Sequence, residues 1–237
     1  MFVLCGGLGK RLRSITEKIP KPMLKFSGKP FLEYLLIYCK MQGIKNFVLS
    51  VGYLKEKIIK YFGNGRKWGI DIKYSNENCP LGTGGALRKA RKLLGKDFFV
   101  VNGDTFVEID LAAMKKFYKS KKAICTIGVL EQRREQNSGF IKFDNAGRIT
   151  AFKSKKSGNA YINSGVYLMN KNIFKYIPKG ISSLENDVFA KMNTGLYAFR
   201  LQSSYFIDIG TIKTYNQSVK EFYKVKNVIS NSLKSAS

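Results

Sequence analysis

Short apolar runs alternate with segments of helical apolar spacing through the first half of the chain, and this alternation constrains the fold more than any other feature. The predicted strands are Phe2–Cys5, Asn46–Val51, Ile70–Tyr74 and Phe98–Val101. The predicted helices between them are Phe31–Gln42, Leu54–Phe62 and Gly84–Leu94. Because strand–helix–strand units run their strands parallel and lay helices over them, the sequence predicts an α/β fold with a mostly parallel sheet and helices on both faces.

The second half of the chain is richer in predicted strands, so the sheet is expected to be mixed. These strands are Ala123–Leu130, Phe140–Asp144, Ile149–Phe152 and Asn163–Met169, and a turn at 144–147 joins two of them. Two further segments, Ser183–Met192 and Thr211–Tyr223, are predicted helices. No repeat or linker interrupts the pattern, which predicts a single domain over residues 1–229 followed by a flexible tail at 230–237.

The composition excludes several kinds of chemistry. The chain has 237 residues, 42 Lys and Arg against 16 Asp and Glu, a formal charge of +26, and no histidine. Without imidazole there is no Ser-His-Asp or Cys-His nucleophile pair, no His-ligated zinc centre and no histidine general base. Catalysis would therefore depend on carboxylates, amines, hydroxyls, backbone amides and bound ions.

The high positive charge does not by itself predict a nucleic-acid partner. The chain has 33 lysines and only 9 arginines, and the lysines are spread along its whole length. Base readout and bidentate phosphate binding favour arginine, so no nucleic acid is expected. The four cysteines lack C-x-x-C spacing, no apolar run approaches the roughly 20 residues of a bilayer span, and the start of the chain lacks a signal peptide. These observations predict a cytoplasmic protein with no membrane partner.

A glycine-rich loop follows the first predicted strand. Gly6, Gly7 and Gly9 lie where ligands bind in α/β sheets, and glycines there let backbone N–H groups approach phosphate oxygens. The loop is not a dinucleotide fingerprint, because Leu12 replaces the third glycine, and it is not a P-loop, because no G-K-[ST] follows. Alone, it predicts either a phosphate cradle or a tight turn.

The residues after the loop make the pattern more specific. Arg11 follows the last glycine, and Lys21 stands between two prolines that hold its backbone extended. The pattern G-G-x-G-x-R-L, followed by T-x-x-x-P-K-P-M-L, resembles the signature of sugar-1-phosphate nucleotidyltransferases, whose fold is Rossmann-like. The resemblance implies that the loop holds the nucleotide's phosphates and that Arg11 and Lys21 neutralise charge at the α-phosphate. Lys10 stands where the family usually has threonine.

Further segments resemble the family in the expected order along nearly the whole chain. The resemblance implies that Asp104 and Asp208 bind Mg²⁺ and are catalytic together with Arg11 and Lys21. The nucleotide-binding residues that it implies are Leu4, Gly6, Gly7, Gly9, Lys10, Glu77, Pro80, Gly82, Thr83, Asn102 and Gly103. The sugar-phosphate-binding residues that it implies are Gly139, Ser154, Lys155, Asn163, Glu185 and Phe206. Taken singly, each aspartate could instead be a turn or capping residue.

The implied reaction needs no histidine. A sugar 1-phosphate oxygen attacks the α-phosphorus of a nucleoside triphosphate, and pyrophosphate leaves. A phosphate monoester has a second pKa of about 6, so the nucleophile is already ionised at neutral pH and no general base is required. Catalysis then consists of positioning two anions and stabilising phosphoryl charge, which Mg²⁺ and fixed cations can do.

Two positions bear on which substrates are used. Glu77 stands where thymidylyl enzymes have glutamine, and a carboxylate can pair with the adjacent N1–H and N2–H₂ donors of guanine. Ser154 replaces a glutamate that many members use for sugar hydroxyls, whereas Lys155 keeps the lysine that contacts the sugar's phosphate. The pattern is closest to heptose-1-phosphate and mannose-1-phosphate guanylyltransferases, which predicts transfer of GMP from GTP onto D-glycero-D-manno-heptose 1-phosphate by a monomer or homodimer.

Two alternatives stay open. One is a thymidylyl- or uridylyltransferase acting on glucose 1-phosphate or another hexose 1-phosphate. The other, from a different class, is a non-catalytic nucleotide-sugar or nucleic-acid binding module. A module that has lost catalysis is expected to lack some of Arg11, Lys21, Asp104 and Asp208, and all four are present.

Overall fold

The computed structural model describes residues 1–7, 9–131, 140–154, 161–202 and 205–234. Its strands are β1 Phe2–Leu4, β2 Lys25–Phe26, β3 Lys29–Pro30, β4 Asn46–Val51, β5 Asp71–Asn76, β6 Asp97–Asn102, β7 Thr105–Val107, β8 Cys125–Glu131, β9 Phe140–Phe143, β10 Ile149–Ser154, β11 Tyr161–Asn170, β12 Leu196–Arg200 and β13 Phe206–Asp208. Its α-helices are α1 Arg13–Thr16, α2 Phe31–Met41, α3 Lys55–Phe62, α4 Gly82–Lys89, α5 Leu111–Ser120, α6 Ile212–Glu221 and α7 Tyr223–Lys234.

The contacts divide the chain into two compact units, and each is described by itself. Unit 1 consists of Met1–Pro80, Asn102–Glu108 and Ser204–Ser237, and unit 2 of Leu81–Val101 and Ile109–Ser203. The chain passes repeatedly between the units, which explains why no linker is visible in the sequence. The predicted α/β fold with a mixed sheet and helices is confirmed.

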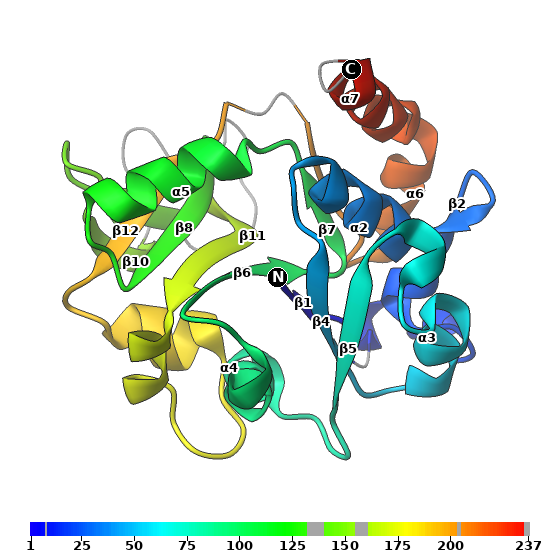
Figure 1. Ribbon diagram of the computed structural model, residues 1–237, viewed down its shortest axis with the longest axis horizontal. Helices are drawn as coiled ribbons and strands as arrows, with labels where there is room; N and C mark the ends of the chain where they lie inside the picture. The colour runs from blue at the N-terminus through cyan, green and yellow to red at the C-terminus, as the bar shows by residue number, and fades with distance from the viewer. Residues whose placement is uncertain (8, 132–139, 155–160, 203–204, 235–237) are drawn as a thin grey trace. The chain divides into compact units, whose positions relative to one another are not determined.

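Strands β1, β4 and β5 of unit 1 run parallel to one another (Figure 1). Strand β4 pairs with β1 on one side, where Phe2 lies opposite Val48, and with β5 on the other, where Val48 lies opposite Lys73. Almost every side chain of β4 is buried, as expected for a strand whose two faces are both covered. Helix α2 buries most of its apolar residues, and β4 has the bounds that the sequence predicts.

A second, two-stranded ladder in unit 1 joins segments that lie far apart in the chain. Strands β7 and β13 pair antiparallel, with Ile207 opposite Phe106 and Asp208 opposite Thr105. Helix α6 begins directly after this ladder at a capping box, in which Thr211 and Thr214 each bond the other's backbone N–H. Helix α7 then extends to Lys234, so residues 230–234 of the predicted tail are helical.

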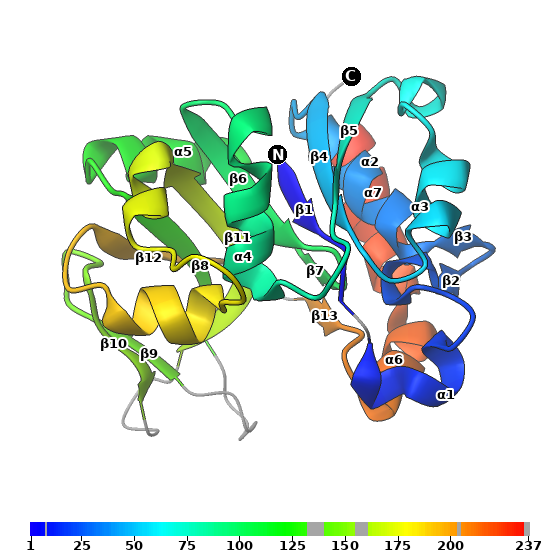
Figure 2. The ribbon, with the colours of Figure 1, turned by 90° about the horizontal axis from the view of Figure 1, so that it is seen from below.

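Unit 2 is organised around β11, its longest strand (Figure 2). This strand pairs antiparallel with β6, β8 and β9, and β12 pairs parallel with β8. The sequence missed α5, although Asp110 caps it by accepting from Ala113 N–H at 2.9 Å and Leu111, Met114 and Tyr118 are buried at helical spacing. It also missed β12.

The prediction of a helix at Ser183–Met192 is confirmed, but the helix is not an α-helix. It forms a π-helix at Leu184–Val188 followed by a 3-10 helix at Phe189–Lys191. The Ser183 side chain accepts from Asn186 N–H at the start of this turn. A π-helical turn changes the direction of side chains within a helix and is common at functional sites.

None of the helices in the described ranges combines the length and the apolar character that a membrane crossing requires.

The β7–β13 ladder should depend on the burial of its apolar side chains. Ile207 in β13 is 3% exposed, whereas Ile212 in α6 is 46% exposed. We expect Ile207→Ala to lower the free energy of unfolding by about 2–4 kcal/mol, because it opens a cavity, and Ile212→Ala to change it by less than about 0.5 kcal/mol. Urea unfolding followed by circular dichroism measures both, and equal losses would contradict the packing described.

Candidate active site

Two carboxylates lie beside each other where the β7–β13 ladder ends. Asp208 lies opposite Thr105 in the ladder register, and Asp104 immediately precedes Thr105. The Ile209 N–H donates to the Asp104 carbonyl at 3.1 Å, so the two backbones stay paired past the last strand residue. The ladder register therefore brings Asp104 and Asp208 together, as the resemblance implies for a shared site.

The surroundings of Asp208 oppose its ionisation. Burial raises the pKa of Asp208 above its usual value, and the negative charge of Asp104 raises it further. The charges of Lys21 and Arg11 and a hydrogen bond from Gly210 N–H partly offset that rise in pKa. A cation placed between the two carboxylates would relieve both the repulsion and the desolvation.

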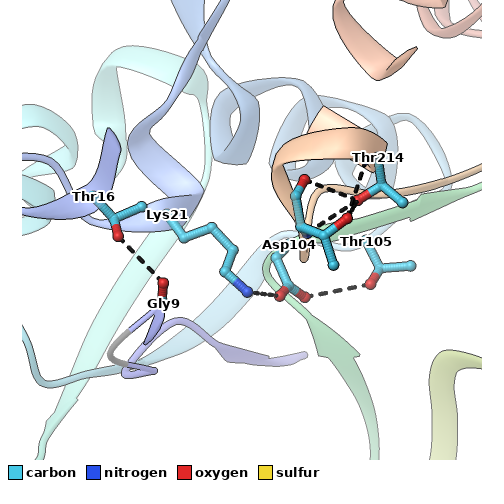
Figure 3. A network of polar contacts seen from close by, with 7 residues as sticks. Gly9, Thr16, Lys21, Asp104, Thr105 and Thr214 are labelled. Carbon is cyan, nitrogen blue, oxygen red and sulfur yellow. Dashed lines mark hydrogen bonds and ion pairs between the residues drawn. The ribbon is translucent and has the colours of Figure 1, made fainter. Parts of the chain in front are cut away.

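Lys21 neutralises the other carboxylate. Its Nζ lies 2.8 Å from Asp104 Oδ2, and its side chain is only 13% exposed (Figure 3). The Thr105 hydroxyl lies 3.3 Å from the other oxygen, Asp104 Oδ1. Pro20 is extended, but Lys21 itself begins a 3-10 helix at Lys21–Met23, so the prediction of an extended backbone at Lys21 is wrong. The two prolines still restrict the backbone from which this ammonium group extends.

Arg11 and Asp208 both lie against Gly210. A Cβ atom on Gly210 would be 2.7 Å from Asp208 Oδ1 and 3.3 Å from Arg11 Nη2. A side chain there would force the carboxylate or the guanidinium to shift, so glycine allows the two groups to approach as they do. Unit 1 thus gathers the four predicted catalytic residues, two acidic and two basic.

The glycine loop is held by a backbone hydrogen bond and by the side-chain hydroxyl of Thr16. Leu12 N–H donates to the Gly9 carbonyl at 2.8 Å, and the buried Thr16 hydroxyl lies 3.0 Å from the Leu12 carbonyl and 3.3 Å from that of Gly9 (Figure 3). Gly9 has a φ of +60°, which favours glycine. Gly7 is exposed, and the side chain of Lys10 lies outside the described part.

Glu77 lies beneath this loop. Its side chain is buried, and Ser50 Oγ donates to Glu77 Oε1 at 2.8 Å. A Cβ on Gly6 would collide with the Glu77 carboxylate, and one on Gly52 would lie 3.0 Å from the Gly6 carbonyl. Gly6 is therefore needed to seat Glu77, whatever it also contributes to phosphate binding.

The segment before Asp104 packs against the end of β1. Gly103 N–H donates to the Leu4 carbonyl at 3.0 Å, and a Cβ on Gly103 would be 2.8 Å from that carbonyl and 2.9 Å from Cys5 Sγ. Asn102 Oδ1 is buried and has no hydrogen-bond partner within the described residues. Its unsatisfied oxygen is consistent with the predicted ligand contact.

Unit 2 contains a second cluster, centred on Glu185. Thr83 and Ser183 donate to Glu185 Oε2 at 3.1 and 2.9 Å, and the Tyr167 hydroxyl donates to Oε1 at 3.2 Å. Asn163 Nδ2 donates to the Tyr167 hydroxyl at 2.8 Å. The structure thus links two residues predicted to bind the sugar phosphate, Asn163 and Glu185, with Thr83, which was predicted to bind the nucleotide.

The glycines of α4 are explained by packing within unit 2. Gly84 N–H donates to the Ser182 carbonyl at 2.8 Å, and Gly85 N–H donates to the same carbonyl at 3.3 Å. A Cβ on Gly82, which has a φ of +70°, would collide with that carbonyl. Two backbone N–H groups in the first turn of α4 are therefore bonded to the protein itself, at the Ser182 carbonyl.

The remaining predicted residues are placed only in part. Pro80 is exposed at the end of the first segment of unit 1, and Phe206 is half-buried in β13 of unit 1, opposite Val107. Gly139 and Lys155 lie outside the described residues, as does the side chain of Ser154.

The carboxylate pair suits a hard cation that keeps part of its water shell. No three His, Cys, Asp or Glu side chains gather into a metal cluster within the described residues. Two carboxylates match Mg²⁺, which binds through one or two carboxylates and completes its shell with water and phosphate oxygens. The residues present therefore fit Mg²⁺ brought together with a polyphosphate better than a metal enclosed by protein.

Ser50 and Tyr167 are among the residues of these clusters that were missed from the sequence. Ser50 is the one polar residue in the buried stretch Phe47–Val51 of β4, and Tyr167 belongs to the N-x-G-x-Y segment in which only Asn163 was selected. A lone serine in a buried apolar stretch is a usable signal, since a buried hydroxyl needs a partner.

Comparison with known proteins identifies the family. The model of the family described as nucleotidyl transferase matches residues 1–224. The chain belongs to the nucleotidyl transferase family. This nucleotidyl transferase is 42% identical over 229 residues to the D-glycero-alpha-D-manno-heptose 1-phosphate guanylyltransferase of Aneurinibacillus thermoaerophilus, covering 93% of this chain and 96% of that protein. The enzyme of the same name from Campylobacter jejuni is 39% identical over 221 residues, covering 90% and 96%.

A solved structure agrees. HddC from Yersinia pseudotuberculosis matches this nucleotidyl transferase with a TM-score of 0.80 and 35% identity, covering 93% of this chain and 98% of that one. HddC has also been crystallised in complex with GMP-PN, and that structure matches equally well.

The raised pKa of Asp208 predicts how the stability of this nucleotidyl transferase changes with pH. When the pKa of an aspartate is higher in the folded protein than in the unfolded chain, the ionised aspartate lowers the free energy of unfolding. This loss of stability shrinks as the pH falls through the pKa of the folded state and is gone below the pKa of the unfolded state. We expect Asp208→Asn to raise the melting temperature at about pH 7 and the gain to shrink near pH 4, close to the ordinary aspartate pKa. Calorimetry in EDTA measures this, and a lower melting temperature of the variant at pH 7 would contradict it.

Proposed function

We propose that this protein transfers GMP from GTP onto a sugar 1-phosphate, D-glycero-D-manno-heptose 1-phosphate, giving GDP-heptose and pyrophosphate. The observation that carries the proposal is the cluster of Asp104, Asp208, Lys21 and Arg11, which offers paired carboxylates and two fixed cations for phosphoryl transfer. The base and the sugar are supported by the two guanylyltransferases that are 42% and 39% identical and by the HddC complex with GMP-PN.

The reaction needs no protein base. An ionised phosphate oxygen of the sugar 1-phosphate forms a bond to the α-phosphorus of GTP, and the bond from that phosphorus to the β-phosphate oxygen breaks. The electron pair of the broken bond leaves with pyrophosphate. We assign to Lys21 and Arg11 the stabilisation of negative charge on the α-phosphoryl oxygens, which a fixed cation does more effectively in a partly buried site.

Asp104 and Asp208 are the residues that would hold Mg²⁺. When bound, the ion would neutralise phosphate charge and orient the triphosphate. In this chain the Asp104 carboxylate is bonded to Lys21, and Arg11 lies near Asp208, so the formal charges of the two acidic and two basic side chains balance. We infer that Mg²⁺ binds together with the triphosphate, whose charge favours a dication.

Glu77 is the residue we assign to guanine. A carboxylate accepts from the adjacent N1–H and N2–H₂ groups, whereas uracil and thymine present one donor between two acceptors. Ser50 holds one carboxylate oxygen at 2.8 Å and so fixes the plane of the group. We place the reaction in the cytoplasm, where nucleoside triphosphates are available. The protein is predicted to act as a monomer or a homodimer.

A pyrophosphate-release screen tests the proposal. GTP, ATP, UTP, CTP and TTP are each combined with heptose, mannose and glucose 1-phosphates in the presence of Mg²⁺. The proposal expects the largest kcat/KM with GTP and heptose 1-phosphate. Fastest turnover of TTP or UTP with glucose 1-phosphate would establish the alternative, and no turnover with any pair would support a binding module.

The metal assignment predicts the behaviour of two substitutions. We expect Asp104→Asn and Asp208→Asn each to lower kcat for Mg²⁺-dependent pyrophosphate release by roughly a hundredfold or more, because charge stabilisation at the phosphoryl group is lost. Asp71→Asn, at an exposed position of β5, is the matched control and should keep full turnover. Circular dichroism verifies folding, and full activity of both site variants would refute the assignment.

The guanine assignment predicts a change in base preference. Glu77→Gln keeps the size of the side chain and an acceptor for Ser50 but loses one acceptor for guanine. We expect kcat/KM for GTP to fall by roughly tenfold to a hundredfold, with a smaller change for UTP. Glu56→Gln, exposed on α3, is the control. Equal losses with GTP and UTP would show that Glu77 acts on the fold rather than on the base.

A further inference from the structure

The Tyr167 hydroxyl joins two separate segments of unit 2. Tyr167 lies on β11 and is completely buried, with 0% of its surface exposed. Its hydroxyl accepts from Asn163 Nδ2 at 2.8 Å and donates to Glu185 Oε1 at 3.2 Å. Burial raises the pKa of Tyr167 well above its usual value, so the hydroxyl keeps its proton and remains a donor to Glu185.

Both partners of this hydroxyl are fixed by further bonds. Asn163 Oδ1 accepts from Gly165 N–H at 3.0 Å, which determines which end of the amide faces Tyr167. Glu185 Oε2 accepts from Ser183 and Thr83, and Thr83 Oγ1 in turn accepts from Leu184 N–H at 2.8 Å. The amide and the carboxylate are therefore held in single orientations.

Asn163 and Glu185 are only half-buried, whereas Tyr167 beneath them is sealed from solvent. An amide N–H₂ and a carboxylate offer the donor and acceptor that neighbouring sugar hydroxyls need. Tyr167 itself cannot contact a ligand, since its hydroxyl is buried and uses both its donor and an acceptor position within the protein.

We propose that Tyr167 is the positioning residue of the sugar site, orienting Asn163 and Glu185 together toward the hydroxyls of a sugar 1-phosphate, with Thr83 as the second support of Glu185. This inference rests on the proposed function. It assigns Thr83 to the sugar rather than to the nucleotide, and it makes the recognition of two hydroxyl groups depend on one buried phenol.

The chain offers a matched control at Tyr118. The Tyr118 hydroxyl on α5 donates to Asp97 Oδ1 at 2.8 Å and accepts from Asn170 Nδ2 at 3.0 Å, which reproduces the amide–phenol–carboxylate order around Tyr167. Tyr118 is 6% exposed, and none of these three residues belongs to a predicted site. Tyr118→Phe thus removes an equivalent hydroxyl without touching Asn163 or Glu185.

The first test compares Tyr167→Phe with Tyr118→Phe, using the sugar 1-phosphate that the wild-type protein turns over fastest. We expect Tyr167→Phe to raise KM for the sugar phosphate by about tenfold while KM for GTP stays within about twofold. Tyr118→Phe should leave both constants unchanged, even where the two variants lose similar thermal stability. An unchanged sugar KM in Tyr167→Phe, or equal rises in both KM values, would overturn the proposal.

The second test uses Thr83. Thr83→Val keeps the shape but loses the hydroxyl, so the sugar KM should rise, and Thr83→Ser, which restores the hydroxyl, should restore the wild-type value. A rise in the GTP KM alone would return Thr83 to the nucleotide and overturn its assignment here. Failure of the proposed function would instead appear in the wild-type protein, as an absence of sugar-dependent pyrophosphate release.

Discussion

The pairing of two like charges, Asp104 and Asp208, is the constraint on which the rest of unit 1 depends. Burial raises the pKa of Asp208, and repulsion from the Asp104 carboxylate raises it further. The arrangement persists because the β7–β13 ladder fixes both backbones and because Lys21 bonds Asp104. The protein accepts an electrostatic cost that a bound cation would remove, which is characteristic of sites built for a ligand.

Glycine has a consistent physical role around this pair. Gly210, Gly103 and Gly6 each lie where a Cβ atom would collide with a neighbouring group: the Asp208 carboxylate, the end of β1 and the Glu77 carboxylate, respectively. A glycine-rich sequence near a phosphate site is usually interpreted through the ligand alone. Here the same glycines also allow the protein's own carboxylates and backbone to approach, so substitution would disturb the site before any ligand arrives.

The helices and strands with strong apolar periodicity could be predicted from the sequence. Features that depend on contacts between residues far apart in the chain could not. Strand β4 and helix α2 follow from apolar runs, and the candidate catalytic residues followed from the resemblance. The π-helix at Leu184–Val188 could not be predicted, because local propensity does not distinguish it from an α-helix. The serine in buried β4 signals that a partner exists, but the sequence does not say that the partner is Glu77, which directly follows β5. The role of Tyr167 emerges only once Asn163 and Glu185 are seen to share its hydroxyl.

The interleaved course of the chain determines when the acidic pair can form during synthesis. Strand β7 leaves the ribosome long before β13, yet the ladder that pairs Asp104 with Asp208 needs both. Contacts of such sequence separation carry a loop-closure cost and form late. All of unit 2 precedes β13 in the chain, so its strands can pair while the acidic pair is still incomplete. A truncated nascent chain should thus carry the polar network around Glu185 well before it acquires the carboxylates suited to a metal ion.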